Sequence, residues 1–164
     1  MIKHIAKILY TRYNLKRIAS YKAVPRINPF SLTVLSRNTH LGRNCNFNGL
    51  IVEGGGKLII GDNFHSGTNI HIITQNHNFD KGTKIPYDST YIYKDVVIGD
   101  NVWVGTGVII LGGVTIGEGA IIQAGSVVVH DIPKYSIAGG HPATVFSTRD
   151  IEHYEKLKKL NCFQ

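Results

Sequence analysis

Residues 92–128 read IYKDVVIGDNVWVGTGVIILGGVTIGEGAIIQAGSVV, and an aliphatic residue stands at every sixth position of this stretch. The series comprises Ile92, Ile98, Val104, Ile110, Ile116, Ile122 and Val128. An amphipathic helix repeats at about 3.6 residues and a half-buried strand at about two, so neither explains the spacing. The stretch predicts a repeat in which each unit is a short strand followed by a corner.

Two further columns of the repeat describe its backbone. With the aliphatic residue counted as the first position, the fifth is mostly small or β-branched, which suits inward packing in a strand. The fourth holds residues that tolerate the left-handed backbone region, as a sharp corner requires. The fifth-position residues are Val102, Val108, Val114, Ala120 and Ser126, and the fourth-position residues are Asn38, Asn44, Asn63, Asn69, Asp95, Asn101, Gly107, Gly113, Gly119, Gly125 and Asp131.

The same register can be followed upstream, with a shift of one residue on the way. It runs through Leu35, Leu41 and Phe47 and then through Ile60, Ser66 and Ile72. A strand and a corner in every unit close a triangle after three units, so coils of about 18 residues stack as parallel strands. We therefore expect an all-β fold, a single-stranded parallel β-helix of about five coils over residues 35–133.

Three regions lie outside this register. The segment between Ile72 and Ile92 is too long for it, and we expect a loop at about 75–91 to leave the β-helix, where catalytic residues are often found. Apolar residues between Ile2 and Ile18 recur on one helical face, which predicts an amphipathic helix over about 2–20. Pro133 ends the repeat, and Thr148 or Asp150 is expected to cap a short C-terminal helix that reaches Leu160.

Length, charge and cysteine content narrow the class of protein. We expect the 164 residues to form one domain, with a lead-in at 1–34, the β-helix at 35–133 and a C-terminal tail and helix at 134–164. The two cysteines, Cys45 and Cys162, lack metal-ligand spacing, which argues against a disulfide framework and a structural zinc site. No long apolar run or signal peptide is present, so we expect a cytoplasmic protein.

The net charge of +7 is concentrated in the N-terminal third. No Asp or Glu precedes Glu53, whereas nine Lys or Arg do: Lys3, Lys7, Arg12, Lys16, Arg17, Lys22, Arg26, Arg37 and Arg43. Such a field attracts anionic saccharides, an anionic membrane leaflet or nucleic acid, and it is equally compatible with a solvated basic arm. We expect no nucleic-acid partner, and a weak contact of the N-terminal helix with the inner membrane leaflet stays open.

Residues 98–145 resemble the C-terminal signature of the galactoside and maltose O-acetyltransferases, in the hexapeptide-repeat, left-handed β-helix acyltransferase superfamily. The likeness rests on tandem hexapeptides with Trp103 in the first, then Ala124–Val128, Asp131–Pro133 and Gly140–Ala143. The short N-terminus and the loop look closest to the capsule and lipopolysaccharide O-acetyltransferases. The resemblance implies left-handed coiling, a homotrimer, and an acetyl-CoA-dependent O-acetyltransferase that acts on a carbohydrate hydroxyl in surface polysaccharide biosynthesis.

The resemblance also assigns residues, and chemistry supports the first of them. His77 matches the catalytic histidine, and an imidazole with a pKa near 6.5 suits a general base that takes a proton from a hydroxyl. No acyl-enzyme is expected, because the thioester is already activated, and no metal is expected. Trp103, Thr106, Ala124, Val129 and His130 match coenzyme-binding positions, Arg149 is the substitute for missing phosphate-binding arginines, and Asn46 and Glu53 are the acceptor-binding candidates.

Other functions remain open from the residues alone. His40, His65, His71 and His77 suggest a metal site like that of the γ-type carbonic anhydrases, which are also β-helices. All four occupy the sixth position of their units, and one face per unit places His65, His71 and His77 on three different faces of one chain. A noncatalytic β-helix that serves as an assembly subunit is the third hypothesis, and it predicts no coenzyme binding.

Overall fold

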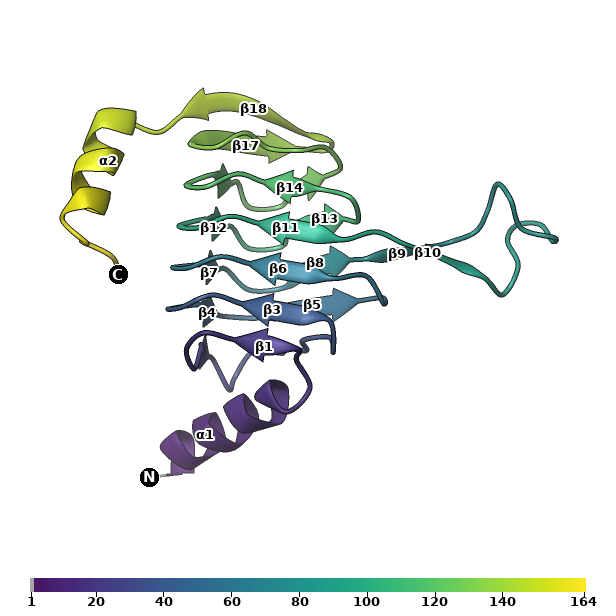
Figure 1. The fold of residues 1–164 in the computed structure, drawn as a ribbon, viewed down its shortest axis with the longest axis horizontal. Helices are drawn as coiled ribbons and strands as arrows, with labels where there is room; N and C mark the ends of the chain where they lie inside the picture. The colour runs from purple at the N-terminus through teal and green to yellow at the C-terminus, as the bar shows by residue number, and fades with distance from the viewer. Residues whose placement is uncertain (1) are drawn as a thin grey trace.

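The structure is a computed structural model that describes residues 2–164 of the chain. It is a three-sided prism of stacked coils, with one helix across the N-terminal end and another beside the last coils (Figure 1).

Each side of the prism is one sheet. Sheet A contains β1 (Ser20–Tyr21), β3 (Thr39–Leu41), β6 (Leu58–Ile60), β11 (Val96–Ile98) and β14 (Thr115–Ile116). Sheet B contains β2 (Arg26–Ile27), β4 (Asn46–Phe47), β7 (His65–Ser66), β12 (Trp103–Val104), β15 (Ile121–Ile122), β17 (Ser136–Gly140) and β18 (Ala143–Thr148). Sheet C contains β5 (Leu50–Glu53), β8 (Ile70–Ile73), β13 (Ile109–Leu111) and β16 (Val127–Val128).

The chain visits sheets A, B and C in turn, and the neighbours within each sheet are parallel apart from the β17–β18 pair. Successive turns pair in register, as when Val97 lies beside Ile59 on one side and Thr115 on the other. The aliphatic residues of the predicted register from Ile98 to Val128, like the fifth-position residues, are all buried inside the prism. Ile92, the first residue of the predicted series, does not join them, because it lies in a strand outside the prism and is 38% exposed. The parallel β-helix predicted from the period of six is confirmed.

The corners follow the residue types expected at the fourth position, with three exceptions. Eight of these residues have positive φ: Asn44, Asn63, Asn69, Asn101, Gly107, Gly113, Gly119 and Gly125. Asn38, Asp95 and Asp131 do not, and their side chains bond backbone groups of a neighbouring coil instead. Glycine at the second position has a packing reason, because a Cβ on Gly105 would lie 2.6 Å from the backbone nitrogen of Ala124.

The β-helix is longer than the sequence register suggested. Six of the seven strands in sheet B run parallel, so the prism has about six coils instead of the expected five. The additional coil comes from residues 20–34, which supply β1, β2 and a bridge between Val34 and Ile51. This coil has a neighbouring coil on one side only, and the terminal units of a repeat protein are commonly atypical in sequence.

Two helices and one hairpin complete the molecule. Helix α1 (Ile2–Leu15) packs on the first coil, and α2 (Ile151–Lys159) begins at Asp150, whose side chain accepts a hydrogen bond from the His153 N–H. Strands β9 (Gln75–His77) and β10 (Tyr91–Tyr93) form an antiparallel hairpin that projects from the prism, and this hairpin is called the arm below. Within residues 2–164, no helix is both long and apolar enough to cross a bilayer.

Candidate active site at the arm and the prism edges

The arm leaves the prism at the edge where sheet C passes into sheet A. Thr74 fixes this point: its backbone N–H and its hydroxyl both donate to the Glu53 carbonyl at 2.8 Å, and its own carbonyl accepts from the Lys94 N–H at 2.9 Å. Gln75 Oε1 accepts a hydrogen bond from the Gly55 N–H at 3.1 Å. The base of the arm is thus tied to two coils, which gives its first residues a defined position.

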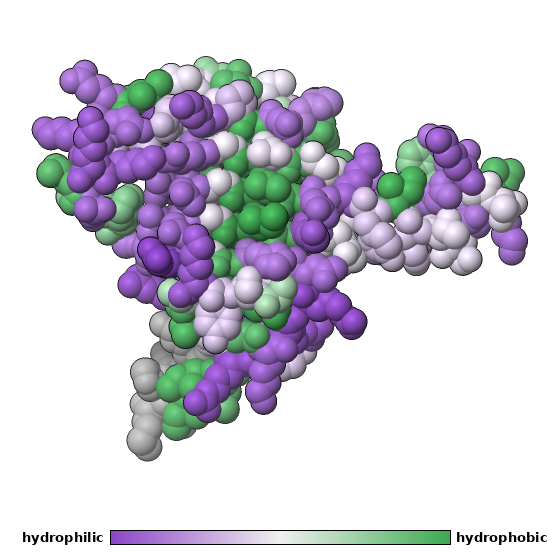
Figure 2. Space-filling view, in the orientation of Figure 1, coloured by the Kyte–Doolittle hydropathy of each residue, from purple (hydrophilic) through white to green (hydrophobic). Residues whose placement is uncertain are grey.

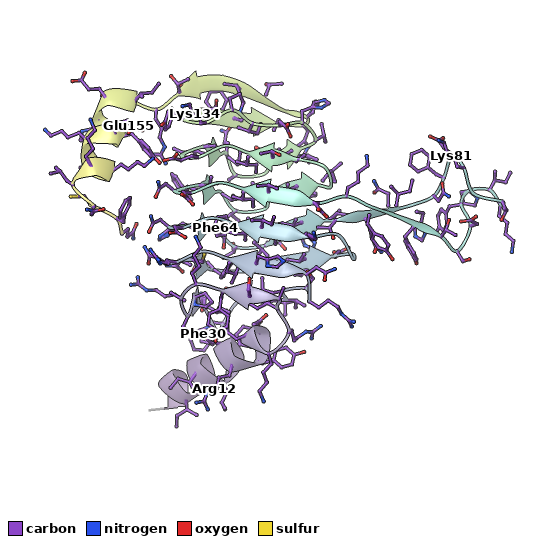
Figure 3. The ribbon with its side chains drawn as sticks, in the orientation of Figure 1. Arg12, Phe30, Phe64, Lys81, Lys134 and Glu155 are labelled. Atoms are coloured by element: carbon purple, nitrogen blue, oxygen red, sulfur yellow. The ribbon has the colours of Figure 1, made fainter. Side chains whose placement is uncertain are left out.

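The far part of the arm is organised by the Asp88 carboxylate. It accepts hydrogen bonds from the backbone N–H of Thr83 at 2.8 Å, the N–H of Thr90 at 2.8 Å and the Thr90 hydroxyl at 2.6 Å. These bonds, the Thr90 hydroxyl foremost, lower the pKa of Asp88 to about 2. Lys81 lies well away from the prism (Figure 3), so the arm is exposed on its sides and at its end.

His77 is the last residue of β9 and pairs with Tyr91 of β10. Its ring stacks on Tyr87, with centroids 3.7 Å apart and planes at 15°, and lies tilted against Tyr91 at 4.8 Å. Nδ1 of His77 is buried and has no hydrogen-bond partner, which leaves Nε2 as the nitrogen to meet a substrate. Two aromatic rings therefore fix the imidazole plane.

Three other predicted site residues lie along the same edge as the arm. Glu53 ends β5 one coil before the arm, and its carboxylate lies 3.3 Å from Nδ1 of His71. Val129 and His130 follow β16 where sheet C again passes toward sheet A. His77, Glu53, Val129 and His130 thus share the edge between sheets C and A, on different coils.

Asn46 and Trp103 lie instead on the outer surface of sheet B. They stand in one row across neighbouring strands, with His65 between them in the register. Trp103 is 54% exposed, an unusual state for the only tryptophan of the chain. Burial, followed by the charge of Arg26, lowers the pKa of His65, so this row carries a neutral imidazole at neutral pH.

A cleft of about 720 Å³ lies between this row and α2. Its lining includes His65, Trp103, Arg149, Tyr154 and Phe163. Helix α2 is held over the cleft by Tyr154, whose hydroxyl accepts from Asn101 at 2.7 Å and donates to Glu118 at 3.1 Å, and by an ion pair between Lys158 and Glu118. The C-terminal helix α2 of the same chain therefore covers one side of the cleft.

The remaining predicted coenzyme residues occupy two more places. Thr106 and Ala124 lie at the edge between sheets B and C, where the Gly125 N–H donates to the Thr106 carbonyl at 2.8 Å. Arg149 lies near the edge between sheets A and B, where its Nε donates to the Gly119 carbonyl at 2.6 Å and its guanidinium covers the Tyr154 ring. Within one chain, Arg149 and Trp103 line the same cleft, whereas His77 lies at a different edge of the prism.

The histidines of the metal hypothesis are separated. His40 is in sheet A, His65 in sheet B, His71 in sheet C and His77 on the arm. Over the part of the chain that the structure describes, no three His, Cys, Asp or Glu side chains are placed to hold a metal ion.

Sequence reasoning missed Tyr87 and Tyr91, which hold the His77 ring. Tyr91 is the cross-strand partner of His77, and a hairpin prediction for residues 75–93 contains that pairing. Tyr87 gives no such signal, because it reaches His77 only through the fold of the arm.

Comparison with known proteins agrees with this architecture. Residues 95–130 match the family model described as bacterial transferase hexapeptide (six repeats). No curated protein matches the chain significantly in sequence. Among solved structures, a maltose O-acetyltransferase from Clostridium difficile 630 is 36% identical with a TM-score of 0.61, over 80% of this chain and 66% of that one.

Two coenzyme complexes are also similar. A galactoside acetyltransferase in complex with coenzyme A is 29% identical with a TM-score of 0.62, over 84% of this chain and 63% of that one. A hexapeptide-repeat acetyltransferase from Vibrio cholerae O1 biovar eltor, complexed with acetyl coenzyme A, is 28% identical with a TM-score of 0.69, over 92% of this chain and 80% of that one. The chain spans 66% and 63% of the length of the maltose and galactoside enzymes. Its six-residue register, its prism and these likenesses show that the chain belongs to the hexapeptide-repeat, left-handed β-helix transferase superfamily.

Proposed function

We propose that this protein transfers an acyl group, acetyl in the simplest case, from coenzyme A to a hydroxyl of a carbohydrate, with His77 as general base. The observation that carries the proposal is the His77 ring, which two tyrosines hold at the base of an exposed arm beside a hexapeptide prism. The similar structures with bound coenzyme A or acetyl coenzyme A support the same cosubstrate here.

His77 has the chemistry for this step. With the proton on the buried Nδ1, the lone pair of Nε2 takes the proton of the acceptor hydroxyl as its oxygen attacks the thioester carbonyl. The tetrahedral intermediate then loses the coenzyme thiolate, which recovers the proton from His77. Direct transfer needs no cysteine nucleophile, and Cys45 is unsuited to that role because burial raises the pKa of its thiol to about 11.

The cleft beside Trp103 fits part of the coenzyme. Its volume of about 720 Å³ and its mixed lining of aromatic, polar and cationic side chains suit an elongated, anionic ligand. We assign Trp103, Thr106 and Ala124 to the pantetheine arm and Arg149 to a phosphate, while Val129 and His130 face the cosubstrate from the other edge. Asn46 and Glu53 are assigned to the acceptor.

A trimer reconciles these positions. Trp103 lies on sheet B and His77 at the edge between sheets C and A, so one ligand meets both most directly in a groove between two prisms. Cyclic symmetry repeats such a groove three times, and each site then takes the arm from one subunit and sheet B from the next.

The test is coenzyme thiol release from acetyl-CoA with a panel of sugars, comparing wild type with His77→Ala and with His40→Ala as the matched control. His40 is a half-exposed histidine on sheet A, away from the arm. We expect His77→Ala to lose about 10²–10⁴ in rate while it still binds acetyl-CoA in calorimetry, because only the proton transfer is removed.

The outcomes separate the parts of the proposal. Full activity of His77→Ala refutes the base assignment. A wild type that binds acetyl-CoA but acylates no sugar refutes the carbohydrate acceptor. A wild type that binds no coenzyme refutes acyl transfer and favours a noncatalytic β-helix or, if metal analysis finds zinc or iron, a metal-dependent one.

A further inference from the structure

Helix α1 packs on the prism through a largely polar face. Thr11 and Asn14 are buried against the first coil, and Asn14 Oδ1 accepts a hydrogen bond from the Leu35 N–H at 3.2 Å. The Tyr10 hydroxyl donates to the Thr33 carbonyl at 2.9 Å and accepts from the Thr33 N–H at 2.7 Å. A surface helix in a soluble protein ordinarily packs its apolar face on the core, whereas α1 packs mainly polar side chains there.

The opposite face of α1 carries an exposed apolar stripe. Ile5, Leu9 and Tyr13 follow one another at intervals of four residues and are 50%, 60% and 52% exposed, and Ile8 beside them is 42% exposed. Residues at that spacing lie one above another on a helix. Figure 2 shows hydrophobic and hydrophilic side chains together on the surface of this helix. We call Ile5, Ile8, Leu9 and Tyr13 the outer stripe.

Cations lie on the same exposed face as the outer stripe, toward the C-terminal end of the helix, and we call Arg12, Lys16 and Arg17 its border. Arg12, Lys16 and Arg17 are exposed on the same helix or just after it, and the Arg17 guanidinium lies over the Tyr13 ring and donates to its hydroxyl. Arg12 and Lys16 line a shallow hollow with Leu9, Tyr13 and Tyr21. Among the side chains that the structure describes, no carboxylate forms an ion pair with Arg12, Lys16 or Arg17. No Asp or Glu occurs before Glu53, so the helix itself offers them no acid.

We propose that α1 is an interfacial anchor that lies in the surface of an anionic lipid leaflet, with the outer stripe among the acyl chains and Arg12, Lys16 and Arg17 among the phosphates. The combination of an apolar stripe, a basic border and a tyrosine at the boundary is the pattern of helices that lie in the membrane interface. Lys and Arg side chains next to such a surface are attracted by its anionic lipids. The inference stands independently of acyl transfer.

The charge argues against a second copy as the occupant of the outer stripe. A self-association through this surface brings the three cations of one helix close to those of another, without acidic residues from either helix to offset them. Like charges at short range in an apolar contact are unfavourable. A leaflet of anionic lipids supplies the opposite charge and the apolar medium together.

The experiment is flotation of the full chain with vesicles of phosphatidylglycerol and phosphatidylcholine, and with vesicles of phosphatidylcholine alone. Two variants alter the anchor: Leu9→Gln/Tyr13→Gln for the stripe and Arg12→Gln/Lys16→Gln/Arg17→Gln for the border. The matched control, Lys57→Gln/Lys156→Gln/Lys159→Gln, removes three exposed cations outside α1. We expect the wild type and the control to float with anionic vesicles only, and the border variant to bind about 100-fold more weakly.

Circular dichroism verifies that each variant is folded, and a cooperative thermal transition of the unattached variants shows that the prism is intact. Equal flotation of the wild type and the two α1 variants overturns the proposal, as does flotation that does not depend on anionic lipid. If no vesicle is bound and the stripe variant instead lowers the molar mass in light scattering, the outer stripe packs between copies and the proposal is wrong.

Discussion

At the scale of single residues, the two thiols of the chain differ sharply in their surroundings. Cys45 is 1% exposed inside the prism, and burial raises its pKa to about 11, whereas Cys162 is exposed beside the cleft. Only the thiolate reacts with a disulfide reagent, and this pKa lowers the thiolate fraction of Cys45 about 100-fold below that of an ordinary thiol. Native protein should therefore release one equivalent of chromophore from Ellman's reagent rapidly at pH 7.5, and denatured protein two.

The assignment of that fast equivalent is checked by substitution. Cys162→Ser should abolish the rapid phase, and Cys45→Ala should leave it unchanged. A rapid phase of two equivalents in the native protein would contradict the buried position of Cys45. Cys45 stands four residues after Leu41, at the fifth position of its unit, where the repeat predicts an inward side chain, and the structure has it buried.

The positions of other residues could not be predicted from the sequence. The six-residue register identified the buried column and most of the corners because those depend on nearest neighbours along the chain. It did not identify the tyrosine that stacks on His77, since Tyr87 meets His77 through a loop that has no repeat. It also did not identify Tyr154 as the residue that docks α2, because its partners Asn101 and Glu118 lie in distant units.

At the scale of elements, the arm depends on one carboxylate. The pKa of Asp88 is lowered in the folded arm, so its stabilising contribution is present above the unfolded value of about 3.9 and is lost as pH falls through about 2. At neutral pH the contribution is complete, and Asp88→Ala should remove it. We expect trypsin to cleave this variant after Lys81 and Lys84 several-fold faster than wild type at pH 8, with the melting temperature of the prism unchanged.

Asp80→Ala is the control for this experiment, because Asp80 lies on the same arm and makes none of the Asp88 hydrogen bonds. It should be cleaved at the wild-type rate. Cleavage of Asp88→Ala at that same rate would show that Thr83 and Thr90 do not depend on the carboxylate. A parallel fall in melting temperature would show that the arm is not a separate unit of stability.

Some coils of the β-helix can be predicted from the sequence and others cannot. The coils from Ile98 onward follow from the sequence alone, whereas the shift between Phe47 and Ile60 becomes intelligible only in the structure. The coil that runs from β3 to β6 contains the turn Gly54–Gly56, which lies at the same edge as the arm. The first coil was missed because α1 covers it in place of another coil, so its inward positions need not repeat the aliphatic column.

At the scale of the whole molecule, the prism separates the two halves of the proposed site. The arm with His77 projects from the edge between sheets C and A, and Asn46 and Trp103 lie on sheet B. If each site joins the arm of one subunit to sheet B of the next, a His77→Ala subunit still offers an intact sheet B, and an Asn46→Ala/Trp103→Ala subunit still offers an intact arm. Two inactive variants should then complement each other when mixed subunits assemble.

The expected recovery follows from counting. In a trimer assembled at random from equal amounts of both variants, half of the arms are intact and half of the sheet B surfaces are intact. About one quarter of the sites are then complete, so the mixture should show about one quarter of the wild-type rate after joint refolding. Each variant refolded alone is the control and should stay inactive. Light scattering should give about three times the 18.1 kDa chain mass for every sample. Trimers without recovered activity would place the whole site within one chain, and monomers would refute the shared site altogether.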